Sequence, residues 1–462
     1  MSKTTVVDIG RFIDEQPLGR YQILAAAICS AIVFGDGFDA QSMGFVAPAL
    51  AATLHISRNA MGPLISSSLF GMTFGALVFG PLADRFGRRP ILIVCTLLFG
   101  ILSLLTATAT TFQQIFIFRL LTGFGLGGAM PNAIALTAEY APKRLRSTVV
   151  MVMFCGFTIG GAFGGFVAAN LITRFGWQSV FIAGGIWPGI AAAIAIARLP
   201  ESIRFLVLKG RQERRVALYL SRIAPKAGIS PDMAFEVEEQ AGGGFVLKQL
   251  FSGGRATVTL LLWVMFFMNL LNLYFLNGWL PTVMSSVGVN VQTAILISTL
   301  LQLGGVTGAL TLGRIIDRKL SFRVLACTYF GSSVCVFLIG GAGASVPLLI
   351  LAVFATGFTV LGSQTSSNAL TAAFYPTAIR STGLGWALGI GRIGSILGPI
   401  LGGTLLSMTP DTRRVFWVVS IPPLIATIAA FAAAPRVKLI PSSAGGHVGV
   451  GVHRSTDQLS QS

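Results

Sequence analysis

Charged residues are scarce in this sequence, and their scarcity excludes most soluble folds. Only 11% of the 462 residues are charged, whereas an average soluble domain carries ~25%. Apolar residues make up 53% of the chain and the mean hydropathy is +0.78, which also excludes a disordered chain. The composition therefore predicts a protein that lies in the lipid bilayer.

Histidine and cysteine are rare as well, and this excludes several kinds of site. The chain has three histidines and five cysteines, and the cysteines are scattered singly, without metal-ligand or disulfide spacing. No lysine follows a glycine, as a nucleotide-binding phosphate loop requires. We therefore expect no metal, no cofactor and no enzymatic activity.

The basic residues give a net charge of +17, but they do not gather as in a nucleic-acid binder. They fall in short stretches between apolar runs, mostly in the two tails and in the loops that join even-numbered to odd-numbered runs. Cytoplasmic loops of membrane proteins carry such an excess of Lys and Arg. We expect both termini in the cytoplasm and no nucleic-acid partner.

Twelve apolar runs are long enough to cross a hydrocarbon core of ~30 Å, which takes ~20 helical residues. The expected spans are 21–47, 61–82, 91–110, 113–138, 147–172, 178–199, 256–281, 292–313, 323–343, 346–371, 382–407 and 414–434. They predict an amino tail, a six-helix bundle, a cytoplasmic loop, a second six-helix bundle and a disordered carboxyl tail, at 1–20, 21–199, 200–255, 256–434 and 435–462.

The two halves are copies of each other. Gly80-Pro-Leu-Ala-Asp84-Arg85 recurs as Gly313-Arg-Ile-Ile-Asp317-Arg318, and Arg146-Ser-Thr148 recurs as Arg380-Ser-Thr382 at nearly the same offset. Matches in this order indicate an internal duplication of six helices, and parallel six-helix repeats are typical of major facilitator transporters.

Two aspartates lie within the first expected helix, at Asp36 and Asp39. An ionised Asp at the bilayer centre costs roughly 2.5–3.5 kcal/mol, so this pair must face a wet cavity or bind partners. No histidine lies within an expected span, and if protons are coupled to transport, the candidate carriers are Asp36, Asp39 and Glu139. The alternative is a buried ion pair that only fixes packing.

Two arginines also lie within expected helices, and each needs an anion. Arg119 can be satisfied by the aspartates, while Arg392 has no acid on its own helix. A substrate carboxylate would suit the fork of the Arg392 guanidinium. The alternative for Arg392 is a structural contact with backbone carbonyls or with Asp84.

Polar and aromatic residues on the seventh and tenth helices complete the candidate substrate site. The duplication maps Asp36 and Asp39 onto Asn269 and Asn272, so the second bundle has amides where the first has carboxylates. The alternative for these groups is to join helices by hydrogen bonds. Trp279 is expected in the outer-interface aromatic belt, or in an aromatic wall with Tyr274 and Phe275. The proposed substrate-binding residues are Arg119, Arg392, Asn269, Asn272, Tyr274, Gln364 and Asn368.

The loop Gly80-Pro-Leu-Ala-Asp84-Arg85-Phe-Gly87-Arg88-Arg89 resembles the loop signature of the major facilitator superfamily. The resemblance implies an all-α membrane protein with twelve transmembrane helices in two pseudo-symmetric six-helix bundles. It also implies a conformational latch formed by Asp84, Arg85, Arg89, Asp317 and Arg318. Pro200-Glu201-Ser202-Ile203-Arg204 resembles a cytoplasmic motif of sugar-type relatives and is expected to form a gate ion pair.

Asp36-Gly37-Phe38-Asp39, together with this loop and with Glu139-Tyr140-Ala141-Pro142, resembles the aromatic acid:proton symporter family. The resemblance implies import of benzoate-, hydroxybenzoate- or protocatechuate-type acids with protons, by alternating access, through the inner membrane of a bacterium. We expect a monomer. An importer of another small organic acid or a sugar, a proton-driven exporter and a channel remain as alternatives.

Overall fold

The structure is a computed structural model that describes residues 6–210, 212–237, 247–319, 321–376, 379–409 and 411–439. Within these residues, twelve helices are long and apolar enough to cross a membrane. The expected number of spans and the all-α membrane fold are therefore confirmed.

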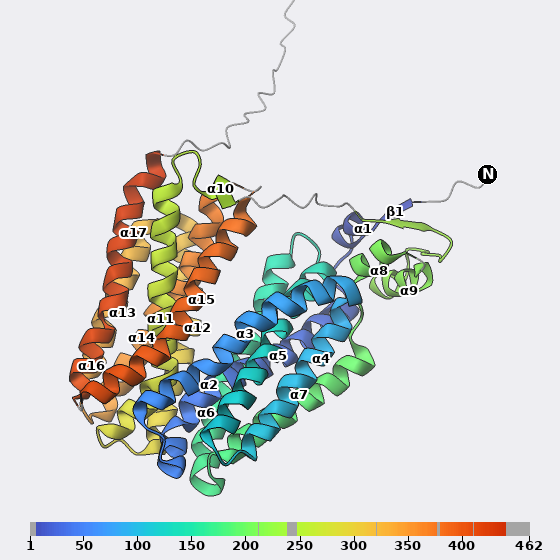
Figure 1. Ribbon diagram of the computed structural model, residues 1–462. Coiled ribbons are helices and arrows are strands. Elements are labelled where there is room, and N and C mark those ends of the chain that lie inside the picture. The colour runs from blue at the N-terminus through green and yellow to red at the C-terminus, as the bar shows by residue number, and fades with distance from the viewer. Residues whose placement is uncertain are drawn as a thin grey trace, which may run out of the picture.

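The membrane helices form two bundles of six (Figure 1). The first bundle consists of α2 (Arg20–Leu54), α3 (Arg58–Phe86), α4 (Arg88–Ala107), α5 (Phe112–Tyr140), α6 (Arg146–Phe175) and α7 (Gln178–Arg198). The second consists of α11 (Ala256–Ser286), α12 (Val291–Lys319), α13 (Phe322–Gly341), α14 (Val346–Phe374), α15 (Arg380–Met408) and the pair α16 (Thr412–Val419) and α17 (Ile421–Leu439).

The twelfth span is broken, whereas the sequence predicted one continuous helix over 414–434. The break falls at Ser420, between α16 and α17. Pro422 and Pro423 follow directly, and proline has no N–H to continue the hydrogen bonds of a preceding helix. Proline is well accepted in a first helical turn, so α17 restarts at this point and continues to Leu439.

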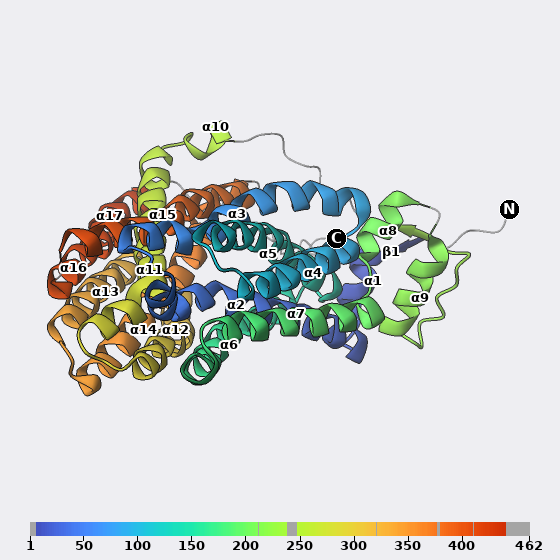
Figure 2. The same ribbon diagram turned by 60° about the horizontal axis from the view of Figure 1, so that its bottom comes forward.

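The segments outside the membrane helices fold against the first bundle. They comprise β1 (Val6–Asp8), α1 (Ile9–Glu15), α8 (Ile203–Lys209), α9 (Glu213–Ile223) and β2 (Ala234–Glu236), while the short α10 (Leu247–Leu250) precedes α11. β1 pairs in parallel with β2, and Figures 1 and 2 show α1, α8 and α9 together beside the first bundle. We call this end of the molecule the α8 side and the opposite end the α16 side.

The buried apolar residues form three hydrophobic cores, and one of them joins the two bundles. One core contains residues of both bundles, for example Leu50 and Met61 of the first with Trp279 and Leu280 of the second. The buried residues of the other two cores belong to one bundle each and lie toward the α8 side. The bundles are therefore packed together at the α16 side and part toward the α8 side (Figure 1).

Hydrogen bonds join the two bundles at the α16 side. Arg58 Nη1 donates to the Leu406 carbonyl at 3.0 Å, and Ser66 Oγ donates to the Ile396 carbonyl at 2.7 Å. The backbones of α2 and α11 also touch here, since a Cβ placed on Gly44 would lie 2.0 Å from the Asn277 carbonyl oxygen. Closure of this side therefore depends on a residue without a side chain at position 44.

Replacing Gly44 with alanine is expected to hold the α16 side open. Overpacking of this kind costs about 1–3 kcal/mol, which lowers the closed population roughly five- to hundredfold. A reporter Ser66→Cys, which is 2% exposed in the closed conformation, is placed in a variant without the five native cysteines and should then react correspondingly faster with a water-soluble maleimide. Gly189→Ala is the matched control, because a Cβ at Gly189 meets no atom within 4 Å. Equal rates in the two variants would contradict this account of closure.

Candidate functional site

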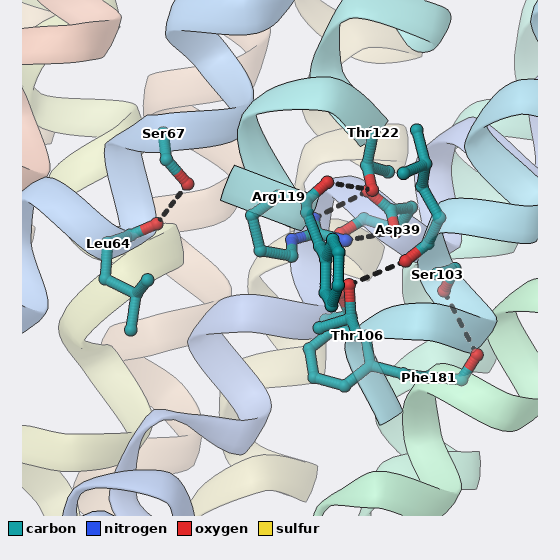
Figure 3. A network of polar contacts seen from close by, with 11 residues as sticks. Asp39, Leu64, Ser67, Ser103, Thr106, Arg119, Thr122 and Phe181 are labelled. Atoms are coloured by element: carbon teal, nitrogen blue, oxygen red, sulfur yellow. Dashed lines mark hydrogen bonds and ion pairs between the residues drawn. The ribbon is translucent and has the colours of Figure 1, made fainter. Parts of the chain in front are cut away.

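The centre of the first bundle holds a buried ion pair between α2 and α5 (Figure 3). Arg119 Nη1 and Nη2 donate to Asp39 Oδ1 and Oδ2, each at 2.7 Å. The side chains are 0% and 1% exposed, and the guanidinium also lies 5.3 Å from the centre of the Phe181 ring on α7. This geometry neutralises both charges and ties three helices together.

Asp36 lies one turn earlier on α2 and is equally buried, but its surroundings differ. Neither carboxylate oxygen has a hydrogen-bond partner among the described residues. The neighbouring Gly37 lets α6 approach closely, since a Cβ there would lie 1.9 Å from the Phe157 carbonyl oxygen. A buried carboxylate without partners is costly when ionised.

Arg392 lies on α15 in the second bundle. Its side chain is half-buried, and no hydrogen bond or ion pair involves its guanidinium in the part of the chain that the structure describes. Neither Asp84 nor a backbone carbonyl holds it, although the sequence left both open. Its charge influences Asp36 of the first bundle and Tyr274 of its own bundle. Arg392 is therefore a cation whose donors have no partner among the described residues.

Amide side chains of α11 and α14 form a short chain. Asn269 Nδ2 donates to Gln364 Oε1 at 2.7 Å, and Gln364 Nε2 donates to Asn368 Oδ1 at 3.4 Å. Asn272 is separate from this chain, and within the described residues neither of its buried amide atoms has a partner. The second bundle thus has buried amide groups that can still form hydrogen bonds.

The aromatic residues of α11 have two different positions. Tyr274 lines a cavity of about 10 Å³ between α2, α3 and α11, with Ser68 and Asn277. Trp279 is 1% exposed and donates to the Pro399 carbonyl at 2.9 Å. The prediction that Trp279 lies in the interface belt is therefore wrong, because this α11 side chain packs against α15. Phe275 is also buried and meets Phe416 edge-on.

Glu139 lies at the α8 side, far from the aspartates. It follows Arg119 by twenty positions on α5, which corresponds to about 30 Å along the helix. Its carboxylate pairs with Arg88 and accepts a hydrogen bond from Ser202. The structure therefore does not bring Glu139 together with Asp36 and Asp39.

The motif around Glu201 does not form the expected ion pair in this conformation. Glu201 Oε1 accepts from the backbone N–H of Arg89 at 3.0 Å and of Ser202 at 2.8 Å. The carboxylate therefore binds two free N–H groups, one of them in the first turn of α4. The ion pair in this region is the neighbouring one between Arg88 and Glu139, which the sequence did not single out.

Among the described residues, no hydrogen bond or ion pair joins the first-bundle residues of the expected latch, Asp84, Arg85 and Arg89, to the second bundle. Asp84 and Arg85 are exposed, and the Arg85 guanidinium lies 5.4 Å from the Phe86 ring centre. Arg89 Nη2 donates to the Ile196 carbonyl of the same bundle at 2.6 Å. The side chains of Asp317 and Arg318 lie outside the described residues. These positions agree with the separation of the bundles at the α8 side.

Two residues of the site carry no recognisable sequence signal. Phe181 supports the Arg119 guanidinium, but phenylalanine is common in this chain, with 34 copies. Ser202 contacts Glu139 from a segment that is distant in sequence. Only the glycines beside Asp36 could have indicated close helix contact, because small residues favour it in membranes.

Two family profiles match the chain. The "Sugar (and other) transporter" family matches residues 23–301, and the "Major Facilitator Superfamily" matches residues 262–453. Among solved structures, the xylose transporter XylE of Escherichia coli, in a partially occluded inward open conformation, is similar with a TM-score of 0.70. It has 16% sequence identity and covers 90% of this chain and 98% of that one. This likeness concerns the fold.

Relatives of known function are much more similar in sequence. The 4-hydroxybenzoate transporter PcaK of Pseudomonas aeruginosa is 43% identical over 425 residues, which cover 92% of this chain and 95% of that protein. The gallate transporter of Pseudomonas putida is 39% identical over 427 residues, with 92% and 95% coverage. The benzoate transport protein of Acinetobacter baylyi is 34% identical over 433 residues, with 92% coverage of each.

Proposed function

Because this multi-pass membrane chain belongs to the aromatic acid transporters of the major facilitator superfamily, we propose that it imports benzoate- and hydroxybenzoate-type acids together with protons. One observation carries this proposal. Within the described residues, neither the buried carboxyl group of Asp36 nor the guanidinium of Arg392 has a hydrogen-bond partner, and these two groups, whose charges interact, belong to different bundles.

The substrate carboxylate binds Arg392 in this proposal. The guanidinium donors are free, and Arg–carboxylate pairs favour a two-bond fork. Tyr274, which lies within reach of the Arg392 charge, contacts the ring. Asn269, Gln364 and Asn368 bind ring hydroxyls, such as those of 4-hydroxybenzoate and gallate, the acids named for two relatives. Asn272 adds amide atoms that have no other partner.

Coupling follows from competition for Arg392. Without substrate, an ionised Asp36 is stabilised by the Arg392 charge. A substrate anion on Arg392 removes this stabilisation, because two carboxylates beside one cation repel each other. Asp36 then carries a proton, and the loaded site has no excess negative charge. Substrate and proton therefore bind and leave together.

The Asp39–Arg119 pair acts as a second element of the coupling. In the present conformation the two charges are paired with each other. Protonation of Asp39 weakens the pair and frees Arg119 donors for the substrate carboxylate in another conformation. Glu139, paired with Arg88 at the α8 side, takes part in proton release there.

In alternating access, the central site opens first to one side of the membrane and then to the other. By the distribution of Lys and Arg, the α8 side is cytoplasmic, so the present conformation faces inward in the inner membrane of a bacterium, with both termini inside. Closure of the α8 side brings the latch residues Asp84, Arg85, Arg89, Asp317 and Arg318 against the opposite bundle. One chain holds both bundles, and we propose that it works as a monomer.

Replacing Arg392 with glutamine tests the substrate site. Loss of charge-assisted hydrogen bonds costs about 1.5–3 kcal/mol, so the benzoate concentration for half-maximal uptake should rise roughly ten- to hundredfold. Uptake of labelled benzoate is measured over a concentration series in cells, with and without a protonophore. Protein in the membrane is quantified in parallel.

Arg436→Gln is the matched control, because Arg436 is an exposed arginine near the end of α17. It should leave the half-maximal concentration unchanged. An unchanged value for Arg392→Gln would remove Arg392 from the substrate site. Export of benzoate, with no uptake, would overturn the proposed direction.

A further inference from the structure

A second cavity lies at the α16 side of the second bundle, between α11, α13, α14 and α16. Its volume is about 200 Å³, and it shares no residue with the site around Asp36 and Arg392. Its apolar lining includes Val283 and Met284 of α11, which follow Tyr274 by nine and ten positions. At a rise of ~1.5 Å per residue, they lie about 14 Å farther along the helix.

The lining of this cavity suits a single aromatic ring. All but one of its large apolar side chains are almost fully buried and belong to the packed core, while Val287 is half-buried. The almost fully buried residues are Val283, Met284, Ile339, Leu349 and Phe416, each at most 3% exposed. An apolar cavity of ~150 Å³ is sufficient to bind benzene, so the present volume accommodates a ring with a carboxylate substituent.

The edge of the cavity carries an unpaired cation. Arg413 and Asp411 both line it, but the Asp411 carboxylate is engaged by Arg414, whose Nε lies 3.4 Å from Asp411 Oδ2. No hydrogen bond or ion pair of the Arg413 side chain occurs among the described residues. Arg413 is exposed, so its guanidinium is available to an anion at the edge of the cavity.

We propose that this cavity is a second binding site for an aromatic monocarboxylate, with the ring among the apolar side chains and the carboxylate at Arg413. The inference rests on the proposed function, since it takes the ligand from the transported class. The cavity lies on the side where the bundles are closed, so it binds an acid from outside while the central site faces the cytoplasm. It thus holds substrate close to the outer entrance between transport cycles.

Equilibrium binding of labelled benzoate to the full chain in lipid nanodiscs tests this inference. We expect two sites in the unmodified protein and one in Arg413→Gln. Arg174→Gln is the matched control, because this exposed arginine near the end of α6 does not line the cavity and should leave both sites intact. Val283→Phe fills the cavity without changing charge and should also remove one site, provided that size-exclusion chromatography shows a monodisperse protein. Arg392→Gln should remove the other site.

The possible outcomes separate the two proposals. Two sites in Arg413→Gln, or a single site that disappears only in Arg392→Gln, would overturn the second site and leave the proposed function intact. A single site that disappears in Arg413→Gln but persists in Arg392→Gln would support the cavity and overturn the central substrate site. Absence of benzoate binding in the unmodified protein would overturn both.

Discussion

Asp36→Asn is expected to abolish proton-driven accumulation of benzoate while it preserves exchange of benzoate across the membrane. An asparagine imitates the protonated carboxyl group but cannot release a proton, so substrate still binds Arg392 and the loaded carrier still changes conformation. Each unit of pH gradient supplies ~1.4 kcal/mol per proton. The unmodified protein should therefore accumulate benzoate roughly tenfold per pH unit, and the variant should show a ratio of about one.

Proteoliposomes with an imposed pH gradient provide the measurement, and preloaded benzoate provides the exchange assay. Asp232→Asn is the matched control, since it removes one exposed carboxylate outside the membrane and should accumulate benzoate normally. Accumulation by Asp36→Asn at the level of the control would refute the coupling role of Asp36.

Asp39→Asn is expected to have a different effect, because it should destabilise the protein as well as stop transport. An asparagine at position 39 leaves the Arg119 guanidinium charged and fully buried without a counter-charge, and it can accept only one of the two 2.7 Å hydrogen bonds. Breaking a buried pair in this way costs about 3–5 kcal/mol. The thermal unfolding temperature, measured by fluorescence-detected chromatography, should fall strongly.

A double-mutant cycle isolates the pair. Asp39→Asn with Arg119→Gln removes both charges and should recover most of the lost stability, without recovering transport. Asp36→Asn is the internal comparison and should unfold close to the unmodified protein, because Asp36 accepts no hydrogen bond from the described residues. Equal destabilisation in the single and double variants would show that the pair does not hold α2 and α5 together.

The sequence was sufficient for the membrane helices because length and apolarity alone define a span. It also predicted that Arg119 would find an aspartate. It did not say which one, because Asp36 and Asp39 lie three positions apart, on the same face of α2. The choice depends on the position of α5 relative to α2, which no local pattern records.

Other features depended on contacts between distant segments. Trp279 occurs near the end of its helix, where an interface ring is common, but α15 covers it and Pro399 accepts its N–H. The ion pair of Arg88 with Glu139 joins α4 and α5. The pattern of apolar residues indicates that a helix exists and which face it buries, but not which helix covers that face.

The pairing of β1 with β2 imposes an order on biosynthesis. Val6 pairs with Ala234, so the first strand leaves the ribosome 228 residues before its partner. At a synthesis rate of roughly 5–20 residues per second, this delay is about 10 to 45 s. During that interval the emerging amino end has no strand to join, and six helices must enter the bilayer first. The small sheet therefore cannot close until the first half of the polypeptide is complete, so the amino-terminal strand is the first segment to be made and among the last of that half to be paired.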